Sequence, residues 1–133
     1  MTPPRVERFM VPGAPQPIAP FSHATGWQDL LFVTGQMPIV AATGAWVRGT
    51  FAAQTDAVMR NLECVLQGLG SDFAHVLQVR IYLTDFTRYE EVNAAYAVWF
   101  PPGCLPARTC IGVTALAGDA DVEIDLVAVR RPG

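Results

Sequence analysis

The chain has 133 residues, of which 51% are hydrophobic and 16% charged, a composition that fits one folded domain and excludes a disordered chain. The net charge is −3, and all nine basic residues are Arg, so the chain has no Lys for a Schiff base or for a Walker A phosphate loop. This acidic balance argues against a nucleic-acid partner, because phosphate contacts need a basic surface.

The sequence also lacks the residues that several other classes of site require. The sequence contains no GxSxG, HExxH or paired-cysteine motif, and we therefore expect no metal ion and no cofactor. Three cysteines without a CxxC pair argue against a disulfide framework and favour a reducing cytoplasm. The longest apolar run, residues 94–100, is much too short to span a membrane, and residues 1–20 lack the apolar segment of an export signal.

The first half of the chain predicts strands followed by a helix. Residues 1–16 are Pro-rich and are expected to be irregular or to lie at a sheet edge. A short strand at 22–25 and a turn at 26–29 precede a buried strand at 30–34, which Gly35 ends. A short extended piece is expected around Trp46. Residues 50–69 carry an apolar stripe at helical spacing, and Gly70 follows as a stop.

The second half alternates between the two kinds of element. Residues 77–83 alternate with period two, so that Leu77, Val79, Ile81 and Leu83 are predicted to share the buried face of a strand. A second helix is predicted over 85–100, ended by Pro101 and Pro102. Two more strands follow at 108–113 and 121–129. This order predicts a single α+β domain whose two helices cover one face of the sheet.

The last predicted strand is apolar on both faces, since Val127 and Val129 oppose Ile124 and Leu126. A chain of this length has too little material to cover both faces, so we expect a homo-oligomer. Glu123 lies on the second face, where loss of hydration would raise its pKa and suit it to proton transfer. The alternative is that Glu123 and Asp125 lie at a solvated edge or pair with Arg.

Arg108 begins the strand at 108–113 and is suited to bind a carboxylate with two parallel hydrogen bonds. If that strand pairs beside the last one, Arg108 and Glu123 could face one cavity; the alternative is a salt bridge between them. Cys110 shares the face of Arg108 and is either a nucleophile or a small buried hydrophobe. His23 and His75 are more consistent with structural roles than with a catalytic base.

Four segments occur in an order that resembles the Rid family, also called YjgF, of reactive-intermediate deaminases. They are Val33–Pro38 (VTGQMP), Val92–Tyr96 (VNAAY), Pro106–Cys110 (PARTC) and Glu123–Arg130 (EIDLVAVR). The resemblance extends over residues 17–131. It implies a chorismate-mutase-like α+β fold, with a mixed sheet and two helices on one face, that assembles as a homotrimeric barrel with ligand clefts between subunits.

The resemblance also implies an activity, which is the cofactor-free hydrolysis of enamines and imines such as 2-aminoacrylate to 2-keto acids and ammonia. Arg108 would bind the substrate carboxylate, Glu123 would activate water and transfer protons, and Cys110 would line the cleft chiefly through its backbone. Residues at other family positions around the pocket are Thr34, Gly35 and Asn93. The partner would be a small carboxylate-bearing imine, enamine or keto acid, with no nucleic acid or membrane involved.

Two departures from the family pattern lie at the cleft. Phe21 stands where many members carry a Tyr, so its missing hydroxyl would have to be replaced, for instance by His23 or Thr34. The connection at 101–105 is also short. These departures leave open a pathway-specific enamine substrate of the aminomuconate kind, or a non-enzymatic module that binds small carboxylates. A ribonuclease, an activity also attributed to the family, is disfavoured by the acidic balance and the absence of Lys.

Overall fold

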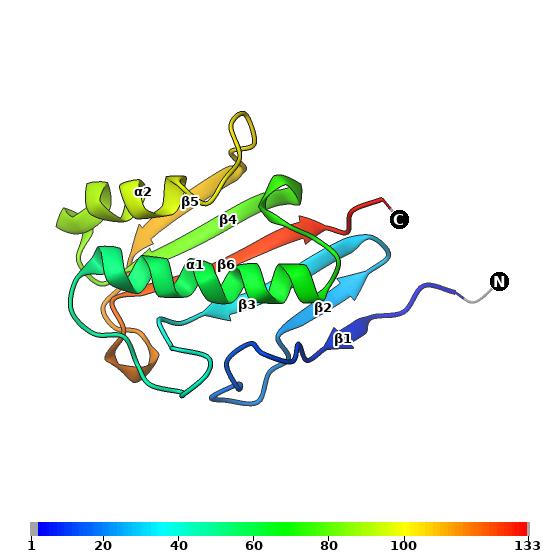
Figure 1. Cartoon of the computed structure of the whole chain (residues 1–133), viewed down its shortest axis with the longest axis horizontal. Coiled ribbons are helices and arrows are strands. Elements are labelled where there is room, and N and C mark those ends of the chain that lie inside the picture. The colour runs from blue at the N-terminus through cyan, green and yellow to red at the C-terminus, as the bar shows by residue number, and fades with distance from the viewer. Residues whose placement is uncertain (1–2, 133) are drawn as a thin grey trace.

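The computed structural model, which describes residues 3–132, contains one six-stranded sheet with the strand order β1-β2-β3-β6-β4-β5 (Figure 1). The strands are β1 (Glu7–Phe9), β2 (Ala24–Trp27), β3 (Leu30–Gln36), β4 (Val76–Leu83), β5 (Ala107–Gly112) and β6 (Val122–Val129). Only β4 and β5 run parallel; the other neighbouring strands are antiparallel. The sheet is therefore mixed, as the resemblance implied.

Both α-helices, α1 (Phe51–Gly68) and α2 (Tyr89–Ala97), lie on the same face of the sheet, which confirms the predicted layering (Figure 1). The Thr50 hydroxyl caps α1 by accepting a hydrogen bond from the Ala53 N–H at 3.0 Å. The stripe that includes Val58 and Leu62 is fully buried against the sheet. The second helix is shorter than predicted, because a 3₁₀ turn over Phe86–Arg88 precedes it and it ends at Ala97.

Strand β6 divides the molecule into a core face and an outer face. Val122, Ile124, Leu126 and Ala128 are buried beneath the helices, while the residues between them are half-buried on the opposite face. This outer face also carries exposed apolar side chains, including Phe32 and Ile111. The two-faced character that the sequence predicted for this strand is thus confirmed.

Strand β4 departs from the predicted alternation at its start. The register with β6 shifts between Val76 and Gln78, so Val76 takes the buried position and Leu77 is 48% exposed. The prediction that Leu77 belongs to the core was wrong, because a bulge reverses the facing of every residue before it. The turn between β2 and β3 is also shorter than predicted and consists of Gln28 and Asp29.

The N-terminal segment is not wholly irregular, because β1 adds a short edge strand to β2 within it. His23 holds the rest of this segment in place. Its Nδ1 accepts a hydrogen bond from the Val11 N–H at 2.8 Å, so its Nε2 carries the proton and donates to the Pro15 carbonyl at 2.7 Å. The imidazole is only 2% exposed and both nitrogens are used, so His23 is structural and does not replace a missing hydroxyl.

Candidate active site

A β-bulge in β3 shapes one half of the candidate site. Val33 pairs with Leu126 and Gln36 with Ile124, so two residues, Thr34 and Gly35, lie opposite Asp125 alone. Bulges of this kind are common beside active sites because they redirect the local backbone. Here the bulge brings the backbone of Gly35 against a carboxylate of β6.

That carboxylate belongs to Glu123. A Cβ atom on Gly35 would overlap Glu123 Oε2 and would lie 2.9 Å from Glu123 Cδ, so only glycine fits at this position without displacing the side chain. Within residues 3–132 the carboxylate has no hydrogen-bond or ion-pair partner. Burial raises the pKa of Glu123, and the negative charge of Asp125 raises it further. The carboxylate is therefore poorly hydrated, and the direction of its pKa shift agrees with the prediction.

Asp125, by contrast, is firmly held. Its Oδ1 accepts a hydrogen bond from Arg80 Nε at 2.8 Å, and its Oδ2 accepts one from the Tyr82 hydroxyl at 2.9 Å. Tyr82 in turn pairs directly with Glu123 in the β4–β6 register. Pairing with Arg, which was the alternative for both acids, is therefore correct for Asp125 and wrong for Glu123.

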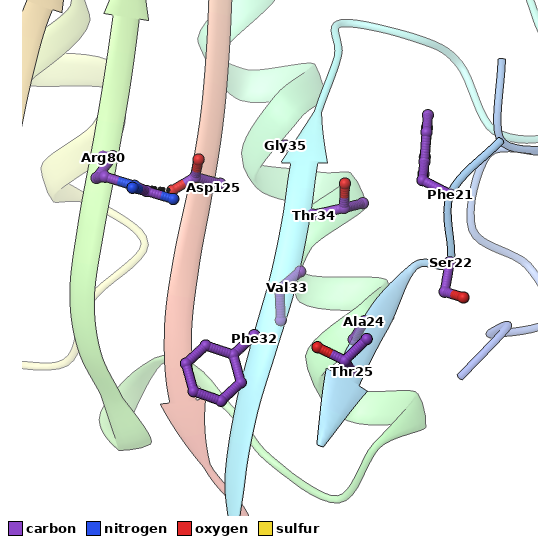
Figure 2. A pocket seen from close by; sticks show the side chains of 10 residues that line it. All are labelled: Phe21, Ser22, Ala24, Thr25, Phe32, Val33, Thr34, Gly35, Arg80 and Asp125. Carbon is purple, nitrogen blue, oxygen red and sulfur yellow. Dashed lines mark hydrogen bonds and ion pairs between the residues drawn. The ribbon is translucent and has the colours of Figure 1, made fainter. Parts of the chain in front are cut away.

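A cavity of about 370 Å³ opens on the outer face beside the bulge (Figure 2). Three of the predicted site residues, Phe21, Thr34 and Gly35, line it together with the Arg80–Asp125 pair. Figure 2 shows the Thr34 side chain directed toward the segment that carries Phe21. Since Phe21 has no hydroxyl and His23 is engaged elsewhere, the hydroxyl groups on this wall are those of Thr34, Ser22 and Thr25.

Arg108 occupies a different part of the molecule, on edge strand β5. It pairs with Val79, whose side chain is buried in the core face, and so it lies on the helix side of the sheet. Its Nη2 donates to the Tyr89 hydroxyl at 2.8 Å, and its guanidinium lies over the rings of Tyr89 and Tyr96, 5.4 and 5.2 Å from their centroids. These contacts hold the guanidinium while leaving most of its N–H groups for a ligand.

Two other predicted residues lie on the same side as Arg108. Cys110 follows it two residues later on β5, and burial raises the pKa of its thiol, with Arg108 opposing that effect. The protonated, half-buried thiol fits the reading of Cys110 as a lining residue better than that of a nucleophile. Asn93 is half-buried one helical turn after Tyr89, on the face of α2 that contacts Arg108.

Within one chain Arg108 and Glu123 do not face a common cavity. Strand β4 separates β5 from β6, and Glu123 pairs with Tyr82 on the outer face while Arg108 lies on the core face. The sequence placed them at one cavity only on the condition that their strands pair, and within one chain this condition is not met, because β4 lies between β5 and β6. The alternative, a salt bridge between them, is wrong for the same reason. Each chain thus presents two separate groups of candidate residues, Arg108 with Tyr89 on the helix side and Glu123 with Gly35 on the outer face, which are called the Arg108 and Glu123 candidate half-sites.

The structure gives no geometry for a metal centre in the region it describes: no group of three or more His, Cys, Asp or Glu side chains within residues 3–132 could hold an ion. Cys64, Cys104 and Cys110 form no disulfide. No helix of this region combines the length and apolar character needed to cross a membrane. The side chains described above suit two tasks: the guanidinium of Arg108 can bind a carboxylate, and the carboxylate of Glu123 can transfer a proton.

Comparison with known proteins places this arrangement in a family. The sequence profile of the family described as Endoribonuclease L-PSP matches residues 12–130. The chain belongs to this family, the Rid or YjgF family. Its resemblance to Rid proteins, first seen in four short segments, is thereby confirmed.

Individual Rid relatives cover nearly the whole chain. Protein DfrA of Myxococcus xanthus is 41% identical over 87% of this chain and 89% of its own length. Reactive Intermediate Deaminase A of Arabidopsis thaliana is 33% identical over 86% of this chain and 61% of its own length. The crystal structure of YyfA, a Rid-family protein of Yersinia pestis, superposes with a TM-score of 0.90 at 31% identity, covering 94% of this chain and 99% of YyfA.

Three features of the half-sites escaped the sequence analysis. Tyr89 was predicted only as part of the second helix, yet its hydroxyl accepts a hydrogen bond from Arg108. The Arg80–Asp125–Tyr82 network could have been suspected, because Arg80 and Tyr82 share the polar face of the alternating strand at 77–83. The bulge at Thr34 and Gly35 has no comparable signal in a single sequence.

Proposed function

We propose that this Rid protein hydrolyses imines and enamines of small 2-amino acids to 2-keto acids and ammonia, without a cofactor, in clefts between the subunits of a homotrimer. The observation that carries the proposal is the placement of a held guanidinium and a free, poorly hydrated carboxylate on opposite faces of one chain. A second copy would bring the Arg108 half-site of one subunit against the Glu123 half-site of the next.

Two surface features support assembly with another copy. Strand β5, which carries Arg108, is an edge strand with one side unpaired within the described residues. The outer face of the sheet, which carries Glu123, leaves Ile111 exposed and Val127 and Val129 only half-buried. Apolar side chains and open strand edges of this kind favour association between protein surfaces.

The proposed reaction requires the protein only to bind the substrate carboxylate and to transfer protons. The guanidinium of Arg108 binds the substrate carboxylate, and Tyr89 keeps it oriented. An enamine first accepts a proton on carbon, loses one from nitrogen and becomes the imine. Glu123 takes a proton from water as the oxygen attacks the C=N carbon, and passes that proton to nitrogen. The hydroxyl proton of the resulting carbinolamine then moves to nitrogen as the C–N bond breaks, so that ammonia leaves and the C=O bond forms. Because imines already hydrolyse in water, positioning and one general base contributing ~10²–10⁴-fold are sufficient.

Hydrolysis of RNA is less well supported, although it is the activity in the family description. A nucleic-acid site needs unpaired cations that can neutralise phosphates. Many of the arginines instead pair with carboxylates of the same chain. These are Arg60 with Asp56, Arg80 with Asp125, Arg88 with Glu91, Arg130 with Glu7 and Arg131 with Asp72.

The direct test is ammonia release from 2-iminopropionate by the purified protein. We expect acceleration over the buffer rate, near-complete loss in Arg108→Ala and a loss of ~10²–10⁴-fold in Glu123→Gln. Arg60→Ala, which removes an exposed arginine of α1, is the matched control and should retain full activity. No acceleration by the wild-type protein would overturn the proposal, and keto-acid binding without turnover would favour a binding module.

A second test asks whether the two half-sites come from different chains. Arg108→Ala and Glu123→Gln chains, each inactive alone, are co-expressed with different affinity tags, and trimers that hold both are purified. In a cyclic trimer about one site in three then combines an intact Arg108 with an intact Glu123 of its neighbour, so about a third of the wild-type activity should return. If mixed oligomers stay inactive, the two residues do not act across a subunit boundary.

A further inference from the structure

The cavity in Figure 2 lies beside the Glu123 half-site but is larger than hydrolysis of a three-carbon imine requires. Its volume of about 370 Å³ is within the range of small-molecule pockets. Gly35 belongs to its wall and also touches Glu123, so the cavity begins where the reacting carbon of a bound 2-imino acid would lie. A substituent on that carbon would extend into it.

The wall of the cavity presents two aromatic rings to solvent. Phe21 is 39% exposed and Phe32 45% exposed. Phe32 extends from the middle of β3, and Phe21 lies on the segment that leads into β2, on the other side of Thr34 (Figure 2). Exposed rings beside a cavity offer apolar contact area that a ligand can bury, and each aromatic side chain contributes a large area.

The charged residues of the cavity are already neutralised. Arg80 and Asp125 form an ion pair with an Nε–Oδ1 distance of 2.8 Å, and the other oxygen of Asp125 accepts the Tyr82 hydroxyl. A charged substituent would face both members of this pair, one of each sign. The pair therefore gives no net attraction to a charged substituent, which would also have to lose its hydration.

We infer that this cavity receives the substrate side chain and selects 2-imino acids with a large uncharged side chain, aromatic above all, over those with a methyl or a charged side chain. The inference rests on the proposed function, since it assumes that the reacting carbon lies at Glu123. Contact of the substituent with Phe21 and Phe32 supplies the preference, and the Arg80–Asp125 pair excludes additional charge.

Binding of stable keto acids tests the inference separately from turnover. Phenylpyruvate, pyruvate and 2-oxoglutarate are titrated into the wild-type protein by calorimetry. We expect phenylpyruvate to bind about tenfold or more tightly than pyruvate, and 2-oxoglutarate to gain nothing over pyruvate. Equal affinities for phenylpyruvate and pyruvate, or tightest binding of 2-oxoglutarate, would overturn the inference whether or not the protein releases ammonia.

Variants locate the preference in the cavity. Phe32→Ala should reduce the ratio of phenylpyruvate to pyruvate affinity toward one, whereas Trp27→Ala, which removes another exposed aromatic ring of the same face outside the cavity, should leave the ratio unchanged. If Phe32→Ala does not assemble, Phe32→Leu keeps the apolar volume and should lower the ratio only partly. The inference would also be overturned if Trp27→Ala changed the affinity ratio and the Phe32 variants did not.

Discussion

The contact between Gly35 and Glu123 gives the most specific prediction from this structure. An alanine at position 35 would place its methyl group on Glu123 Oε2, 2.9 Å from Cδ and 3.1 Å from Cγ. Carbon atoms need roughly 3.5–4.0 Å at optimal separation, so the whole carboxylate must rotate away. Because Gly35 does not need a left-handed backbone, the substitution itself introduces no backbone strain.

Gly35→Ala should therefore separate activity from stability. The Glu123 side chain can move toward solvent, and loss of glycine reduces the entropy of the unfolded chain, so the free energy of unfolding should change by less than about 1 kcal/mol. Activity should fall ~10²–10⁴-fold, the contribution of a general base that is no longer positioned. The assays are ammonia release from 2-iminopropionate and denaturant unfolding on the same sample.

Two further variants complete this experiment. Gly26→Ala is the matched control, because its Cβ would also be crowded, 2.9 Å from the Phe9 ring, but far from Glu123; it should retain activity. In the double variant Gly35→Ala/Glu123→Ala, the Gly35 change should cost no activity beyond that of Glu123→Ala alone. A folded Gly35→Ala protein with kcat/KM within about threefold of wild type would refute the assigned role of this contact.

Three other variants test the surroundings of the site. Asp125→Asn removes a negative charge that raises the pKa of Glu123, so the acid limb of the kcat/KM–pH profile should move to lower pH; an unmoved or raised limb contradicts the electrostatic argument. His23→Ala leaves the buried Val11 N–H without its acceptor and should lower the free energy of unfolding by ~2–4 kcal/mol, measured by denaturant titration. An unchanged free energy of unfolding would mean that the hydrogen bonds of His23 to Val11 and Pro15 do not stabilise the fold. Leu62→Ala empties a fully buried position of α1 and should cost ~2–5 kcal/mol in the same titration, while a loss below about 1 kcal/mol would indicate that the core collapses around the gap.

Periodicity was sufficient to predict much of the fold. The apolar stripe of α1 and the alternation of β6 are local patterns, and each was realised with its predicted facing. Leu77 failed because a bulge, which is set by pairing with a distant strand, reversed the local alternation. A single sequence contains the alternation but not the register that interrupts it.

The sequence predicted candidate residues for the site but not their arrangement. The raised pKa of Glu123 followed from its position in an apolar strand face, and the structure agrees. The relative facing of Arg108 and Glu123 depends on β4 lying between their strands, and nothing in the local sequence specifies that order. The contact made by Tyr89 was missed for a similar reason, since a predicted helix over 85–100 does not indicate which of its residues meets a charged side chain from a distant strand.

The opposed facing of Arg108 and Glu123 has a consequence for how such a protein would respond to dilution. The sheet lies between the Arg108 guanidinium and the Glu123 carboxylate of one copy, so no side-chain rotation can bring the two groups together. An isolated copy would therefore remain folded but be inactive. Turnover per chain would then fall as the protein is diluted below the concentration at which copies associate, while the unfolding transition of each copy persisted. Loss of activity at unchanged secondary structure would be the signature of dissociation.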